Sequence, residues 1–143
     1  MDRRLIEVYG PDVPVETADR LAVDLTCDGA TDQVAGFHDP DGPGGPTYAV
    51  AIATTDTPDG AVALIPFDLP LDAARQTALC PVDDPADIRL EVEKWSPADQ
   101  RNVLGLKLAC PCAIVVVDGQ CDSPRLFWNG FEGEGPPVIF FRN

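Results

Sequence analysis

Apolar and polar residues alternate in short runs along most of this chain. A β-strand turns successive side chains to opposite faces, so an alternating run predicts a strand with one buried face. Residues 88–95 show the pattern most clearly, because apolar and charged side chains alternate almost throughout. Residues 113–117 are instead continuously apolar, which indicates a central strand that is covered on both faces. The pattern therefore predicts a fold made mainly of strands.

Several runs are rich in β-branched, aromatic or alternating apolar residues and are bounded by turn-forming residues. They span residues 4–9, 21–27, 48–54, 61–67, 88–95, 113–118, 125–128 and 138–141. The clearest hairpin joins 48–54 to 61–67. In its turn, Pro58 suits the first central position and Gly60 suits a left-handed backbone.

Helical signals are fewer. Apolar residues recur at helical spacing within 71–79, and Pro81 ends this predicted helix. Ser96 suits the N-cap of a second, short helix. Residues 39–46, rich in Pro, Gly and Asp, predict a long surface loop. We expect a mainly β protein with one domain over 1–143, an antiparallel sandwich or barrel of about eight short strands with one or two short helices, with α+β as the alternative.

Charge restricts the partners that this domain can bind. The 143 residues include 24 acidic and 10 basic ones, for a net charge of −14. Binding to a nucleic-acid backbone or to an anionic membrane needs clustered Lys and Arg, so neither partner is expected. The acidity is expected to lie in turns and on polar strand faces over the whole surface. Three explanations fit this acidity: a functional requirement, a halophilic source or GC-rich codon usage.

The N-terminus and the cysteines predict the cell compartment. No apolar run follows the basic pair Arg3 and Arg4, so no secretory signal is expected. The expected location is the cytoplasm, or an assembled particle that carries the protein elsewhere. In a reducing compartment all five cysteines should be free thiols, and their odd number agrees with that.

Four cysteines are candidate metal ligands. Cys110 and Cys112 form a C-x-C pair, Cys121 follows after eight intervening residues, and Cys80 is a distant fourth ligand, with Cys27 as a substitute. Structural zinc sites normally use C-x2-C or wider spacing, which is absent here. The cysteines are therefore expected to fill the core as small apolar residues, and no metal or other cofactor is expected.

The sequence offers little catalytic machinery. A nucleophilic cysteine needs a nearby base, and the single histidine, His38, is predicted to lie in a loop without a role. Phosphate-binding glycine loops, nucleophile elbows and zinc-protease motifs do not occur in the sequence. The protein is therefore not expected to be an enzyme.

Aromatic residues gather near the C-terminus, where they are candidates for partner binding because exposed aromatics often anchor interfaces. The candidates, with two neighbouring glutamates, are Phe127, Trp128, Phe131, Phe140, Phe141, Glu132 and Glu134. The structural alternative is that these rings cap the core. In an extended strand, Phe140 and Phe141 must point to opposite faces.

Three functions fit these observations. The first is a non-enzymatic binding module of the inhibitor, immunity-protein or nucleic-acid-mimic type, whose acidic surface meets a basic partner protein. The second is a structural subunit that contacts identical or neighbouring subunits, such as a virion surface or cement protein, with 138–141 as its interface. The third is a small cysteine- or zinc-dependent enzyme.

Overall fold

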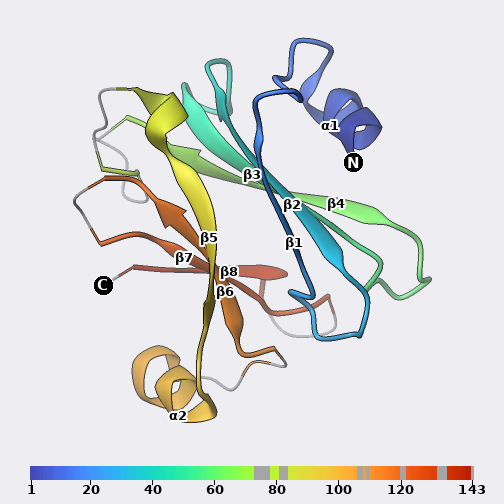
Figure 1. Cartoon of the computed structure of the whole chain (residues 1–143), viewed down its shortest axis with the longest axis vertical. Helices are drawn as coiled ribbons and strands as arrows, with labels where there is room; N and C mark the ends of the chain where they lie inside the picture. Colours follow the sequence, from blue (N-terminus) through green and yellow to red (C-terminus); the bar gives the residue numbers. More distant parts are fainter. Residues whose placement is uncertain are drawn as a thin grey trace.

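The computed structural model describes residues 1–72, 78–80, 84–105, 108, 110–119, 122–131 and 135–142. Two four-stranded antiparallel sheets make up a small β-sandwich, and the mainly β prediction is confirmed (Figure 1). The strands of the first sheet are β1 (Asp19–Val23), β2 (Asp32–Asp39), β3 (Thr47–Thr54) and β4 (Ala63–Pro70). Those of the second are β5 (Arg89–Lys94), β6 (Cys112–Val117), β7 (Arg125–Trp128) and β8 (Val138–Phe141). Neighbours in each sheet follow chain order.

Short helical segments flank these sheets. Helix α1 (Asp2–Tyr9) lies beside the first sheet, and α2 (Pro97–Asp99) lies at one end of the second (Figure 1). A 3-10 turn, η1 (Pro85–Asp87), precedes β5, and a π-helical turn, η2 (Gln100–Leu104), follows α2. Ser96 caps α2 as predicted, because its hydroxyl accepts the Asp99 amide. Most of the predicted helix within 71–79 lies outside the described residues.

Residue size along β3 explains how the first sheet packs on both faces. All eight residues of β3 are buried. The large side chains Tyr48, Val50 and Ile52 join the core between the sheets, together with Ile114 and other residues of the second sheet. The small residues Ala49 and Ala51 face the opposite way, in the cluster that contains Leu5 of α1. Alanine there lets the helix approach the sheet closely.

One predicted strand was wrong: residues 4–9 belong to helix α1. Leu5 is fully buried in the cluster that also takes in Met1 and Tyr9, a spacing of four residues that places all three on one helix face. Ile6 and Val8, which made the segment look like a strand, are exposed.

One strand was missed altogether. β2 (Asp32–Asp39) pairs with both β1 and β3, yet its glycine and terminal aspartates resemble a turn. Gly36 is required there, because a Cβ at that position would collide with the Tyr48 hydroxyl.

The predicted strand 21–27 is confirmed only in part, because β1 ends at Val23, whereas the remaining strand predictions agree with the structure within a few residues. β7 and β8 have the predicted bounds, and the hairpin of β3 and β4 turns where expected, with Gly60 at φ 72°. β6 is an interior strand with five buried residues. In the part of the chain that the structure describes, no helix is long and apolar enough to span a bilayer.

Candidate functional site

The predicted aromatic interface does not form a continuous surface. Phe127 and Trp128 are 0 % and 2 % exposed, so both are core residues and do not reach a partner in this fold. Phe131 is exposed and packs edge-to-face on Trp128, with 5.3 Å between ring centroids. The alternative that the rings belong to the core therefore holds for Phe127 and Trp128, because β7 is an interior strand of its sheet.

The last strand divides its aromatics between two faces, as predicted. Phe140 packs in the core between the sheets and stacks on Phe67, with 6.2 Å between centroids. Phe141 points to the outer face of the second sheet, near Trp95. Glu132 and Glu134 lie outside the described residues. The C-terminal strand therefore contributes mainly to packing.

The expectation that all cysteines are reduced is wrong. Cys27, in the loop after β1, forms a disulfide with Cys110, 83 residues away. Cys80 is disulfide-bonded as well. Two of the four candidate metal ligands, Cys80 and Cys110, are thus not available as thiolates, and Cys121 lies outside the described residues. The sequence did not show that the β1–β2 loop approaches Cys110, which is a non-local contact.

Cys112 is a buried free thiol beside this disulfide. Its Sγ lies 3.4 Å from the Cys110 Sγ, and it also lies near the carbonyls of Asp24 and Leu25. Burial raises the pKa of the Cys112 thiol, and the negative charges of Asp24 and Asp32 raise it further. A thiol held in its protonated form is a poor nucleophile. His38 lies in strand β2 and not in the predicted loop, near the opposite end of that strand from Asp32.

A different surface of the protein carries a group of acidic side chains with few basic ones beside them. Two adjoining pockets of about 610 and 550 Å³ share Asp12, Pro14, Phe37, His38 and Pro40, and we call them together the acidic groove. Six aspartates line it: Asp12, Asp19, Asp39, Asp41, Asp68 and Asp84. Among the described lining residues only His38 and Arg89 carry basic groups, and Arg89 already pairs with Glu91 at 3.1 Å.

The groove wall contains polar atoms that lack partners. The hydroxyls of Tyr9 and Tyr48 and the Oδ1 atom of Asp68 are buried without a hydrogen bond. Burial raises the pKa of Asp68, and the nearby charge of Asp39 raises it further. The pKa of the Tyr9 hydroxyl is raised by burial and then by Asp68 and Asp39, so these three groups act on one another. Unsatisfied buried polar groups cost about 1–3 kcal/mol each, which a bound donor can recover.

The acidity is concentrated in one half of the chain, which corrects the expectation that it covers the surface evenly. Residues 1–72 hold 14 acidic and 3 basic residues, a net charge of −11, whereas residues 73–143 hold 10 and 7, a net charge of −3. Two of the three basic residues, Arg3 and Arg20, pair with Glu7 and Asp2. The difference in net charge between residues 1–72 and residues 73–143 was the one sequence feature that indicated the groove.

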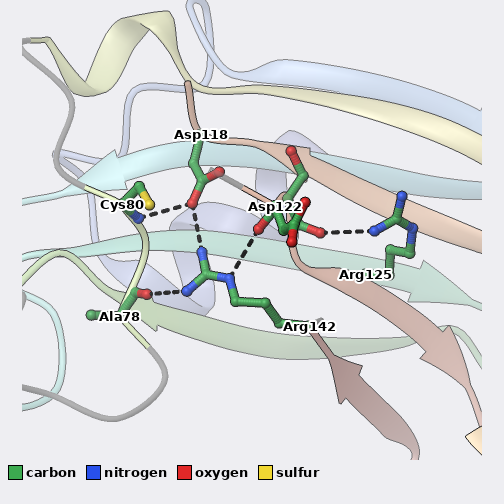
Figure 2. Close-up of polar contacts among 7 residues, drawn as sticks. Ala78, Cys80, Asp118, Asp122, Arg125 and Arg142 are labelled. Atoms are coloured by element: carbon green, nitrogen blue, oxygen red, sulfur yellow. Dashed lines mark hydrogen bonds and ion pairs between the residues drawn. The ribbon is translucent and has the colours of Figure 1, made fainter. Parts of the chain in front are cut away.

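A second polar cluster pairs a buried carboxylate with an arginine through one oxygen, Oδ2 of Asp118, while its Oδ1 stays buried without a hydrogen bond. Asp118 is fully buried, and its Oδ2 accepts hydrogen bonds from the Cys80 amide at 2.9 Å and from Arg142 at 2.7 Å (Figure 2). Arg142 also donates to the carbonyls of Ala78 and Asp122, so one guanidinium ties the C-terminus to two other segments (Figure 2). This cluster has a structural role, because its charge is paired inside the protein.

Comparisons with protein-family models, with curated proteins and with solved structures found no match. The acidic groove is therefore the feature from which a function can be inferred. Most of its residues were not predicted, because they are spread from Val8 to Arg89 and meet only through the pairing of the strands.

Proposed function

We propose that this protein is a non-enzymatic binding module whose acidic groove holds a lysine- or arginine-bearing segment of a partner protein. The observation that carries the proposal is the lining of the groove: six aspartates surround two adjoining pockets, and the one arginine there is already paired. Opposite potentials accelerate encounter and disfavour wrong partners, so such a surface selects for positive charge.

The size and chemistry of the groove support an extended basic side chain as the ligand. Each pocket falls within the range of about 300–1,000 Å³ that is usual for small-ligand sites. A guanidinium carries five N–H donors and no acceptor, so it complements carboxylate oxygens and hydroxyls. Asp12 and Asp41 are exposed on the groove and offer it carboxylate acceptors, whereas Asp68 Oδ1 and the Tyr9 hydroxyl are buried in the wall behind them.

The disulfides support an oxidising compartment for this binding, in place of the expected cytoplasm. Disulfides form and persist in secreted, periplasmic or surface proteins and are rare in reducing compartments. Cys27 is exposed, so a reducing environment has direct access to its bond with Cys110.

The alternative of an assembly subunit has less support, because 138–141 serves packing. Val138 is 3 % exposed and Phe140 stacks on the other sheet, so part of this edge strand is used for packing, while Ile139 and Phe141 stay half-buried.

Titration with defined peptides tests the proposal. We expect a labelled Arg-Gly repeat peptide to bind in fluorescence anisotropy, with affinity falling steeply between about 50 and 500 mM NaCl. The same peptide with citrulline in place of arginine should not bind. The double variant Asp39→Asn/Asp68→Asn should weaken binding about tenfold.

The matched control is Asp99→Asn/Asp122→Asn, which removes two exposed charges from outside the groove. It should bind almost as the unmodified protein does. If both double variants lose the same affinity, or if salt has no effect, net charge alone or apolar contact explains the binding and the groove proposal fails.

A further inference from the structure

The loop between β1 and β2 carries a second group of carboxylates, separate from the acidic groove. Asp24, Asp28 and Asp32 each place one carboxylate oxygen within 4.8 Å of those of the other two. Asp28 is exposed, Asp24 is half-buried and Asp32 is buried. Asp32 begins β2, whereas the groove residues Phe37 and His38 lie near the end of that strand. The two sites are thus independent.

Asp32 is the buried member of the cluster, and only one of its two carboxylate oxygens is hydrogen-bonded. The residue is 1 % exposed, and its Oδ2 accepts hydrogen bonds from the amides of Leu25 and Thr26 at 2.8 and 3.1 Å. Its Oδ1 is buried with no partner at all. The hydroxyl of Thr26, on the same loop, is also buried and unpartnered.

No described residue supplies a positive charge to this carboxylate. Buried carboxylates are normally paired with a cation or coordinate a metal. Among the described residues no Lys or Arg forms an ion pair with Asp24, Asp28 or Asp32. Asp118, the other fully buried carboxylate, has Arg142 for this purpose. Three mutually close carboxylates also repel one another unless a cation lies between them.

We propose that this loop binds a calcium ion through Asp24, Asp28 and Asp32. Oxygen donors of this kind suit a hard cation, and an irregular loop accommodates the flexible coordination of calcium better than the strict octahedron of magnesium. A soft metal is disfavoured, because two of the three nearby sulfurs form the Cys27–Cys110 disulfide. That disulfide also anchors the loop to the second sheet, so the carboxylates are held together before the ion binds.

Calcium titration of the metal-free full-length protein tests the site. After chelator treatment we expect calorimetry with CaCl2 to give one site with a dissociation constant of about 10⁻⁴ to 10⁻³ M, as in extracellular modules. CaCl2 should raise the melting temperature, whereas NaCl at equal ionic strength and MgCl2 at equal concentration should raise it much less.

Two variants separate the site from general charge effects. Asp28→Asn changes an exposed residue and should fold normally while weakening calcium binding at least tenfold. Asp59→Asn is its matched control. Both aspartates are exposed, and each accepts a hydrogen bond from the backbone amide two residues later in the chain, Asp28 from Ala30 and Asp59 from Ala61. Asp59→Asn should bind calcium as the unmodified protein does.

The outcomes that overturn the proposal are distinct. Absence of calcium uptake at about 10 mM, far above the expected constant, would exclude the site. Equal losses in Asp28→Asn and Asp59→Asn would mean diffuse screening of a negative surface. A response to MgCl2 equal to that for CaCl2 would contradict the assignment to calcium.

Discussion

The two sheets of this sandwich treat their carboxylates differently. In the second sheet, Asp118 pairs with Arg142 and Glu93 pairs with Arg125 at 2.8 Å. In the first sheet, Asp32 and Asp68 are buried or half-buried, and neither forms an ion pair with a described residue. Oδ1 lacks a hydrogen bond in Asp32, Asp68 and Asp118 alike, so the difference between the sheets lies in the paired arginine and not in the hydrogen bonds.

This difference is the basis of both proposed binding sites. A charge that is paired inside the protein has no need of an external partner, and removing either member of the pair damages the fold. An unpaired carboxylate costs stability in the free protein, and a bound cation recovers that cost. Aspartates that are paired with an arginine should be needed for folding, and aspartates without such a pair should be needed for binding.

We expect the largest effect from removing the Cys27–Cys110 disulfide, which joins the loop after β1 in the first sheet to the second sheet. Replacing both Cys27 and Cys110 by alanine opens a loop that spans 83 residues, which should cost about 4 kcal/mol of unfolding free energy. Urea unfolding of the double variant measures it. Cys112→Ser is the control, because it removes a buried thiol without opening a loop, and it should cost much less.

The second largest effect tests the paired carboxylate. Arg142→Met keeps the apolar stem but leaves Asp118 without its cation, which should cost about 3 kcal/mol. In the double variant Asp118→Asn/Arg142→Met, a neutral amide replaces the stranded charge and can still accept from the Cys80 amide. More than half of the loss should return in urea unfolding. An additive loss would show that the pair is not coupled.

The third substitution should increase the free energy of unfolding instead of lowering it, because it removes a carboxylate that has no ion pair among the described residues. The folded protein binds a proton at Asp68 more tightly than the unfolded chain does, since burial and Asp39 raise the pKa of Asp68. Ionised Asp68 therefore destabilises the fold at neutral pH. Asp68→Asn should stabilise it by less than about 1 kcal/mol after solvent screening, with the gain vanishing below about pH 4.

Asp68→Asn should weaken binding of the Arg-Gly peptide at the same time, the trade-off expected of a residue retained for function. Thermal unfolding at neutral and acidic pH, together with the peptide titration, measures both effects. A variant that is less stable at neutral pH would place Asp68 with the paired, structural carboxylates.

The smallest effect concerns a paired carboxylate at the surface. The hydrogen bond from Arg125 lowers the pKa of Glu93, so the pair stabilises the fold above the ordinary pKa of glutamate and this contribution disappears as the pH falls through the lowered value. Glu93→Gln should cost about 0.5 kcal/mol at neutral pH, because the side chain is 39 % exposed. The difference from the unmodified protein in urea unfolding should vanish in acid.

Much of the fold was predictable because its signals are local. The alternation in residues 88–95, the turn at Pro58 and Gly60, and the cap at Ser96 each depend on neighbours in the chain. The split of Phe140 and Phe141 between two faces follows from strand geometry alone. Segment 4–9 was misread because its exposed Ile6 and Val8 imitate a strand.

The sites were not predictable in the same way, because they depend on contacts between distant segments. Only the tertiary structure pairs Cys27 with Cys110, buries Trp128, and gives Asp118 an arginine from the C-terminus. The sequence by itself determined seven of the eight described strands, most of the turns and the negative charge. Strand pairing decided which described aspartates have a cationic partner within the protein and which do not, since charge compensation depends on distance in space and not on separation along the chain.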